Sequence, residues 1–337
     1  MIIVMEQNAD EDKIHHAIDR VEEKGLEAIL LRGEKRNVIA AIGDKREIPE
    51  DYWLATPGVE RIVPILSRYK LASQEISDHA TRVHIDGQMV GGNRIAVIAG
   101  PCAVESEEQM MQAARSVKAA GAVALRGGAY KPRTSPYSFQ GLQGKGLEIL
   151  SSVREETGLP VVTEVLAPRD VEEVAECADV LQIGARNMQN YVLLEEVGKT
   201  DKPVLLKRGI SATVDELLLA AEYVLKNGNA EVILCLRGIR TFEQQTRYTL
   251  SIGALAYLKQ ATHLPVIVDP SHSAGQRSLV AALARAGIAA GADGLLVETH
   301  PNPEQALVDG GQSLTLDGFG KLMCELRGVA EALGRSL

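Results

Sequence analysis

The chain has 337 residues, of which 45% are hydrophobic, 24% charged and 4% aromatic. This composition predicts a soluble globular protein with a large core, and the length exceeds the roughly 250 residues of a single α/β barrel by enough for a second small domain. The formal net charge of −9 excludes the broad basic surface that binding of nucleic acid or of an anionic membrane requires. We therefore expect any anionic ligand to be met by a local basic cluster.

The amino-terminal residues lack a basic segment followed by a long apolar stretch, and no later segment approaches the roughly 18 apolar residues of a membrane span. These features predict a cytoplasmic chain with neither a membrane nor a nucleic-acid partner. The four cysteines are scattered without a CxxC pair, which indicates neither a disulfide framework nor a zinc ribbon.

Residues 1–66 predict a small α+β domain. Strands are expected at 2–6, 27–33, 37–43 and 60–66, with helices at about 10–24 and at 51–55. This β-α-β-β-α-β order is the ferredoxin-like pattern. The segment holds 9 Lys and Arg against 14 Asp and Glu and no cluster that suggests catalysis, so we expect it to bind a regulator or to support an oligomer.

Residues 67–93 predict a polar connector followed by a hairpin. Asp86-Gly87 stands between two short alternating runs, which is a strong hairpin signal. If a barrel follows, this hairpin could cover its bottom.

Residues 94–337 predict a (β/α)₈ barrel. Apolar runs recur at 94–100, 122–127, 160–165, 179–184, 203–209, 231–238, 265–271 and 294–300. Each run is followed by a plausible helix, the last at about 317–333. Such near-continuous apolar strands are typical of a parallel sheet that is buried on both faces, and eight units favour a closed TIM barrel. An open doubly wound sheet is the alternative, and the lack of a GxGxxG after any strand disfavours it.

Barrel active sites lie at the carboxyl ends of the strands. In a closed barrel the seventh, eighth and first strands are neighbours, so His272, Glu298 and Cys102 should converge, and Asp309 in the following loop can complete the group. A thiol, an imidazole and two carboxylates suit a divalent transition metal better than magnesium. The sequence therefore predicts a metal site, although each residue alone could be an ordinary core or rim residue.

The remaining strand ends are basic. Six cations belong to this rim: Arg126, Lys131, Arg133, Arg186, Lys207 and Arg237. Buried strand ends do not accumulate cations unless anions neutralise them, and arginines match phosphate and carboxylate groups. We expect two phosphates and a carboxylate to bind here, although local acids such as Glu164 could pair with one or two of the cations.

Seven motifs at these strand ends resemble one enzyme family. They are IAGPCAVES, LRGGAYKPRTSPYSFQG, QIGARNMQN, LLKRG, CLRGIR, VDPSHSAGQR and VETHPNPEQALVDG. In this order they resemble 3-deoxy-D-arabino-heptulosonate 7-phosphate synthase (DAHP synthase) of the type Iβ kind, which has an N-terminal ferredoxin-like regulatory domain. The family condenses phosphoenolpyruvate with erythrose 4-phosphate and releases phosphate in the first step of the shikimate pathway.

The resemblance implies roles for individual residues. Cys102, His272, Glu298 and Asp309 would hold one divalent ion, which could be Mn, Fe, Zn or Co. Arg126, Lys131, Ala185, Arg186, Lys207 and Arg237 would bind phosphoenolpyruvate, and Lys131, Pro132, Arg133 and Thr134 would bind erythrose 4-phosphate. Lys131, Cys102 and His272 are the expected catalytic residues. Lys131 is our choice of proton donor, with a pKa that we expect neighbouring cations to lower.

Two alternatives remain. The sister enzyme 3-deoxy-D-manno-octulosonate 8-phosphate synthase uses arabinose 5-phosphate, and its second loop resembles KANRS, where this chain has KPRTS at 131–135. The second alternative is that the chain is a catalytically silent sensor of a phosphorylated metabolite. The resemblance also implies a homotetramer whose N-terminal domain binds tyrosine or phenylalanine as a feedback inhibitor. The simpler alternative is that this domain only assists oligomerisation.

Overall fold

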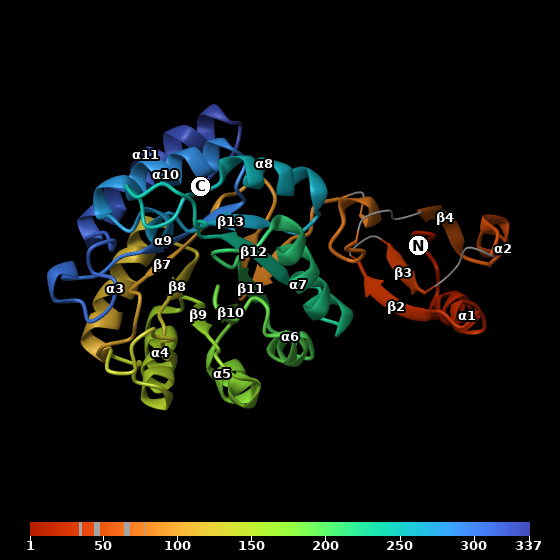
Figure 1. The fold of residues 1–337 in the computed structure, drawn as a ribbon, viewed down its shortest axis with the longest axis horizontal. Helices are drawn as coiled ribbons and strands as arrows, with labels where there is room; N and C mark the ends of the chain where they lie inside the picture. Colours follow the sequence, from red (N-terminus) through yellow and green to blue (C-terminus); the bar gives the residue numbers. More distant parts are fainter. Residues whose placement is uncertain (34–35, 44–47, 64–67, 78) are drawn as a thin grey trace. The chain divides into compact units, whose positions relative to one another are not determined.

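The structure is a computed structural model, and it describes residues 1–33, 36–43, 48–63, 68–77 and 79–337. The chain divides into two compact units (Figure 1). The first contains Met1–His79 with Ala261–His263, and the second contains Ala80–Gln260 and Leu264–Leu337. Each unit has its own core, and each is described separately below.

The first unit has a four-stranded antiparallel sheet in the order β2-β3-β1-β4. Its elements are β1 (Ile2–Met5), α1 (Glu11–Glu22), β2 (Glu27–Arg32), β3 (Asn37–Ile42), α2 (Glu50–Leu54), β4 (Val59–Val63) and the 3₁₀ turn η1 (Gln74–Ile76). This confirms the ferredoxin-like prediction. Residues 64–66 of the expected strand 60–66, and the domain boundary predicted after residue 66, lie outside the described residues.

Helix α1 begins where the sequence predicts. The side chain of Asp10 accepts a hydrogen bond from the backbone N–H of Lys13, which satisfies one of the free donors at a helix start. Ile14, Ala17 and Val21 form its buried face and pack into a core that includes Trp53. The unit is therefore a sheet with a helical layer, held by its own apolar core.

The second unit is a closed barrel of eight parallel strands, in the order β10-β11-β12-β13-β14-β7-β8-β9. The strands are β7 (Ala96–Gly100), β8 (Ala124–Arg126), β9 (Val161–Glu164), β10 (Val180–Ile183), β11 (Val204–Lys207), β12 (Val232–Leu236), β13 (Val266–Val268) and β14 (Gly294–Glu298). Pairing of β14 with β7 closes the sheet, so the barrel prediction is confirmed and the open sheet is excluded.

Helices surround the barrel, as Figure 1 shows. They are α3 (Glu107–Ala120), α4 (Gly144–Thr157), α5 (Val171–Cys177), α6 (Tyr191–Gly198), α7 (Val214–Lys226), α8 (Ile252–Ala261), α10 (Arg277–Ala289) and α11 (Leu316–Ala332). The short helix α9 (Pro270–Ala274) and the 3₁₀ turns η2 (Pro168–Asp170) and η3 (Pro303–Gln305) belong to the connections that follow β13, β9 and β14. Because the surrounding helices cover the outer face of strands that are buried throughout, most strand residues are apolar, and the charged ones stand at the carboxyl ends of β8, β9, β11 and β14.

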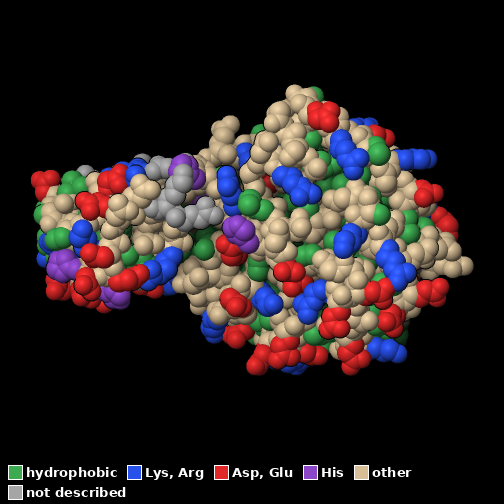
Figure 2. All heavy atoms as spheres, turned by 180° about the vertical axis from the view of Figure 1, so that it is seen from behind, with side chains coloured by type: hydrophobic (Ala, Val, Ile, Leu, Met, Phe, Trp, Pro, Cys, Tyr) green, Lys and Arg blue, Asp and Glu red, His purple; other side chains and the backbone are tan. Residues whose placement is uncertain are grey.

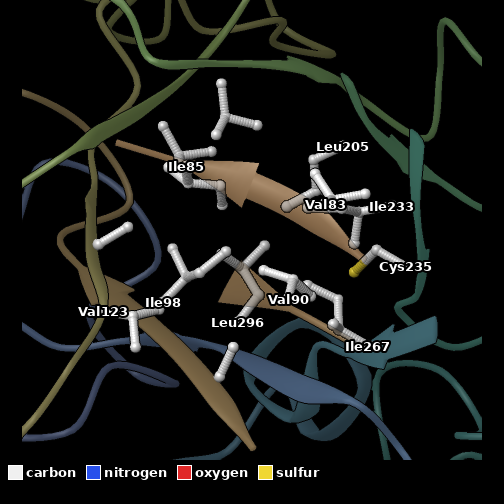
Figure 3. Close-up of a cluster of buried hydrophobic side chains, with 14 residues drawn as sticks. Val83, Ile85, Val90, Ile98, Val123, Leu205, Ile233, Cys235, Ile267 and Leu296 are labelled. Atoms are coloured by element: carbon white, nitrogen blue, oxygen red, sulfur yellow. The ribbon is translucent and has the colours of Figure 1, made fainter. Parts of the chain in front are cut away.

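The predicted hairpin is present as β5 (Val83–Ile85) and β6 (Gln88–Val90). Asp86 and Gly87 have φ angles of 39° and 75°, the positive pair that a tight hairpin turn needs. Val83, Ile85 and Val90 pack against the barrel side chains drawn in Figure 3. This cluster includes Ala96 and Val180, the first residues of β7 and β10, so the hairpin covers the amino-terminal end of the barrel as expected.

Charged side chains of both signs are mixed on the face shown in Figure 2. Lysines and arginines stand among aspartates and glutamates there. Within the described residues, each helix is too short or too polar to span a bilayer.

Candidate active site

The structure brings the four predicted metal ligands together. One ligand atom from each of Cys102, His272, Glu298 and Asp309 lies within 4.8 Å of the others. They come from the end of β7, from α9, from the end of β14 and from the loop before α11. The convergence follows from barrel closure, because residues far apart in sequence meet where β13, β14 and β7 lie side by side.

Local backbone features place these ligands. At Gly100, φ is +153°, and a Cβ there would lie 2.2 Å from the carbonyl oxygen of Arg126, so glycine is required two residues before Cys102. His272 sits in the short helix α9, which starts with Pro270 and is capped by the side chain of Asp269. Asp309 has φ +54°, an uncommon conformation for a residue other than glycine.

The donor set fits a divalent transition ion. Ligand atoms bonded tetrahedrally to one ion at about 2.0–2.3 Å lie roughly 3.3–3.8 Å apart. Three distances in the cluster already fall in this range: Sγ of Cys102 lies 3.3 Å from Oδ2 of Asp309, and Nε2 of His272 lies 3.4 Å from Oε1 of Glu298 and 3.7 Å from Oδ2 of Asp309. Cys102 and Glu298 are buried and the other two are partly buried. One thiol, one imidazole and two carboxylates match zinc, iron, cobalt or manganese better than magnesium.

Cations neutralise the acidic groups around this cluster. Nη1 of Arg126 lies 2.7 Å from Oε1 of Glu298, and Nζ of Lys207 lies 2.7 Å from Oδ2 of Asp269. All four of these side chains are buried. Among the described residues, Glu298 and Asp269 form close ion pairs with rim cations, whereas Glu164, which the sequence suggested, acts on Lys131 through its charge.

These charges decide the protonation states. Burial alone would raise the pKa of Glu298, but His272 and Arg126 outweigh it and lower the pKa to about 2. Burial lowers the pKa of His272, although Asp269 and Glu298 oppose this shift. Burial also raises the pKa of the Cys102 thiol. The balance of these effects keeps Glu298 ionised at neutral pH.

A cavity of about 260 Å³ opens beside the cluster. All the cations of the predicted rim line it, together with the other expected binding residues: Arg126, Lys131, Pro132, Arg133, Thr134, Ala185, Arg186, Lys207 and Arg237. His272 and Asp309 also face it. The structure thus places the basic rim and the metal cluster around one space.

Two buried donors of this rim lack a partner. Nη1 of Arg237 and Nε of Arg126 are buried and make no hydrogen bond to any residue that the structure describes. Unpaired buried donors are costly, and a ligand with anionic oxygens would satisfy them. These atoms thus favour anion binding in the cavity.

Lys131 lies between the cluster and the rim. Its Nζ donates to the carbonyl oxygen of Cys102 at 3.1 Å and to Sγ at 3.2 Å. Burial lowers the pKa of Lys131, but Cys102 and Glu164 outweigh this effect and the net shift is upward. The expected lowering is therefore wrong, because Cys102, Glu164 and Glu298 together raise the pKa of Lys131 more than burial and Arg126 lower it.

Sequence reasoning missed several residues of the site. Arg247 and Gln182 line the cavity. Glu164, which the sequence suggested only as a partner for a rim cation, also lines it. Asp269 accepts a hydrogen bond from Lys207. Glu164 ends β9 and Asp269 follows β13 directly. Asp269 also precedes the predicted ligand His272 by three residues, a signal that could have been noticed. Arg247 lies far from a strand end, in the long loop between β12 and α8, and has no such signal.

Comparison with known proteins agrees with this geometry. The profile of the DAHP synthetase I family matches residues 74–335, and that of the DAHP synthase ferredoxin-like domain matches residues 1–67. The chain is 47% identical over 334 residues to phospho-2-dehydro-3-deoxyheptonate aldolase of Thermotoga maritima, covering 99% of both chains.

A solved structure and a second type of relative are also similar. A crystal structure of phospho-2-dehydro-3-deoxyheptonate aldolase (DAHP synthase) from Thermotoga maritima has a TM-score of 0.79 and 46% identity, covering 99% of this chain and 98% of that one. A 2-dehydro-3-deoxyphosphooctonate aldolase of Syntrophotalea carbinolica is 35% identical over 259 residues, covering 71% of this chain and 92% of that protein.

Proposed function

The chain belongs to the DAHP synthetase I family of enzymes, and from this premise we propose that it condenses phosphoenolpyruvate with D-erythrose 4-phosphate and water. The products would be 3-deoxy-D-arabino-heptulosonate 7-phosphate and inorganic phosphate. The observation that supports this best is the single cavity that six rim cations share with His272 and Asp309. The two substrates bring two phosphates and one carboxylate, which matches this concentration of positive charge.

We propose that Cys102, His272, Glu298 and Asp309 hold one Mn²⁺, Fe²⁺, Zn²⁺ or Co²⁺ ion. When bound, such an ion supplies Lewis acidity toward the aldehyde of the sugar phosphate. The protein contributes the donor atoms, which lie within 4.8 Å of one another, and the surrounding cations that keep Glu298 ionised.

Phosphoenolpyruvate would bind on the side of Arg126, Arg186, Lys207 and Arg237. Arg126 and Arg237 line the cavity and would bind its anionic oxygens, and Ala185 lines the same cavity. Erythrose 4-phosphate would bind along residues 131–134, with Arg133 and Thr134 toward its phosphate. Fixing both substrates in one cavity converts a bimolecular encounter into an oriented reaction.

The chemistry has three parts. The π electrons of the C2=C3 bond of phosphoenolpyruvate form a bond from C3 to the aldehyde carbon, the π bond of the aldehyde breaks, and the aldehyde oxygen takes a proton. Water adds to the electron-deficient C2 and loses a proton, which leaves a hydroxyl and the phosphate ester on C2. The bond between C2 and the ester oxygen then breaks with its electron pair going to phosphate, and the hydroxyl proton is transferred to the departing phosphate, which releases inorganic phosphate and leaves the ketone.

Lys131 is the proposed donor of the proton to the aldehyde oxygen. Its raised pKa keeps it an ammonium at neutral pH, and an alkoxide is basic enough to take its proton. Glu164, a buried carboxylate in the cavity wall, is the proposed acceptor of the proton that water loses. Both assignments depend on the side chains lying within reach of the reacting atoms.

The decisive assay measures loss of phosphoenolpyruvate with erythrose 4-phosphate or arabinose 5-phosphate, with and without a chelator. We expect turnover with the four-carbon sugar and loss of turnover with the chelator. Turnover only with arabinose 5-phosphate would favour the octulosonate reaction, which the name of the Syntrophotalea relative suggests. No phosphate release with either sugar in the presence of Mn²⁺ would favour the sensor hypothesis.

We further propose that residues 1–66 form a regulatory domain, residues 67–93 a connector with its hairpin, and residues 94–337 the catalytic barrel of a homotetramer. The match of residues 1–67 to the DAHP synthase ferredoxin-like domain supports this division. Tyrosine or phenylalanine is the proposed inhibitor. Deletion of residues 1–66 should abolish inhibition by both amino acids, and unchanged sensitivity would refute the regulatory role.

A further inference from the structure

Arg247 connects two loops that lie far apart in the sequence. It belongs to the segment between β12 and α8, yet its Nη1 atom lies 3.0 Å from Oε1 of Gln312 and 3.3 Å from Oδ1 of Asp309. Both partners belong to the loop between β14 and α11. The guanidinium therefore contacts a predicted metal ligand and one of its neighbours.

Gln312 extends this contact to a second predicted ligand. Its Nε2 donates to Oε2 of Glu298 at 2.6 Å, and the side chain is buried. A guanidinium can only donate hydrogen bonds, so Arg247 requires the carbonyl oxygen of the amide to face it. The amide nitrogen must then face Glu298, whereas a flipped amide would present its oxygen to the carboxylate and repel it.

The two carboxylate oxygens of Asp309 have different partners, and Arg247 contacts only one of them. Oδ1 faces the guanidinium, whereas Oδ2 accepts a hydrogen bond from Sγ of Cys102 at 3.3 Å and lies 3.7 Å from Nε2 of His272. Asp309 has a positive φ of 54°, a conformation that persists only where surrounding contacts hold it. The contact with Arg247 is one of these.

We propose that Arg247 is a positioning residue that orients both carboxylate ligands, Asp309 directly and Glu298 through Gln312, for binding of a divalent ion. This inference rests on the proposed metal site. Residues that orient metal ligands typically contribute 10- to 100-fold to metal affinity. The positive charge of Arg247 repels a cation. If Arg247 acted only through its charge, its removal would therefore increase the affinity for the metal.

The test is a titration of the metal-free full chain with Co²⁺, read by the cobalt absorption bands and by calorimetry. Arg247→Met should bind Co²⁺ about 10- to 100-fold more weakly, and Arg247→Lys should recover part of the loss because one nitrogen makes both contacts. Arg240→Met is the matched control, since this exposed arginine stands in the same loop. It should bind Co²⁺ as the unsubstituted chain does.

A double-mutant cycle sharpens the test. Gln312→Met removes the link to Glu298 with little change of volume, and its effect combined with Arg247→Met should be less than additive. Full additivity would overturn the route through Gln312. Unchanged or tighter Co²⁺ binding by Arg247→Met would overturn the proposal, and a raised KM for either substrate with unchanged Co²⁺ binding would make Arg247 a substrate-binding residue instead.

The unsubstituted chain separates this proposal from the metal site itself. It should bind Co²⁺ with a thiolate absorption band that Cys102→Ala removes. If the unsubstituted chain binds no Co²⁺, the metal site fails and this inference fails with it. If it binds Co²⁺ and Arg247→Met binds equally well, only the role of Arg247 fails.

Discussion

The guanidinium of Arg126 and the carboxylate of Glu298 form a buried ion pair at 2.7 Å, reaching across β7 from the two strands that flank it. Arg126→Met would leave Glu298 ionised and without this partner. Breaking one partner of such a pair costs about 3–5 kcal/mol, so we expect the free energy of unfolding to fall by that amount in urea denaturation with a chelator. Arg115→Met, which breaks the exposed pair with Glu156, should cost less than about 1 kcal/mol. Equal losses in the two variants would contradict the prediction.

Lys131→Met should lower kcat by about 10²- to 10⁴-fold, the usual contribution of a positioned proton donor. Steady-state kinetics with saturating substrates measure this effect. Lys145→Met is the control, because Lys145 is exposed at the start of α4 and should keep normal turnover. If Lys131→Met retains near-normal turnover, the proton donor is another group.

Removal of divalent ions should abolish turnover, and addition of Mn²⁺, Fe²⁺, Zn²⁺ or Co²⁺ should restore it. Because a thiolate prefers softer ions, Cys102→Ala should weaken Zn²⁺ binding more than Mn²⁺ binding in competition with a chelator. Cys324→Ala removes an exposed cysteine and should leave both affinities unchanged. A Cys102→Ala variant with normal Zn²⁺ affinity would argue against Cys102 as a ligand.

Tyr248 should support the anion-binding conformation of Arg237. The guanidinium carbon lies 4.3 Å from the centre of the tyrosine ring, and a cation–π contact contributes about 0.5–2 kcal/mol. Tyr248→Leu should therefore raise the KM for phosphoenolpyruvate by roughly 2- to 30-fold. Tyr248→Phe keeps the ring and should stay near the original value. Equal KM values for the leucine and phenylalanine variants would show that the aromatic ring does not contribute to phosphoenolpyruvate binding.

His263 should make stability depend on pH. Burial lowers its pKa from the ordinary value of 6.5, although its hydrogen bond to the carbonyl oxygen of Leu71 opposes this shift. The unfolded chain then binds the proton more readily than the folded chain, so this contribution to stability is complete above pH 6.5 and decreases as the pH falls below it.

Thermal unfolding between pH 8 and pH 5 measures this contribution. His263→Gln should have a flatter profile than the unsubstituted chain, whereas the exposed His84→Gln should follow the original profile. Parallel profiles for all three proteins would show that His263 does not determine the pH dependence.

Much of the architecture follows from local patterns in the sequence. Eight apolar runs separated by helical segments are sufficient to predict a closed parallel barrel, because strands that are buried on both faces carry few polar residues. The hairpin at Asp86-Gly87 is equally local, since two consecutive positive φ angles favour these residue types. Closure of the barrel then predicts that Cys102 and Glu298 meet, although 195 residues lie between them.

The tertiary structure decided the features that depend on side chains from several loops at once. The net pKa shift of Lys131 results from a balance between burial and the anions around it, which strand positions alone do not give. The contact between Arg247 and Gln312 joins residues 65 positions apart in two loops whose courses no periodic pattern describes. The sequence by itself determined the barrel and the residue types at its mouth, because hydrophobic periodicity and strand order are local signals. Only the folded chain determined which charges pair, because that depends on distances of a few ångströms between separate loops.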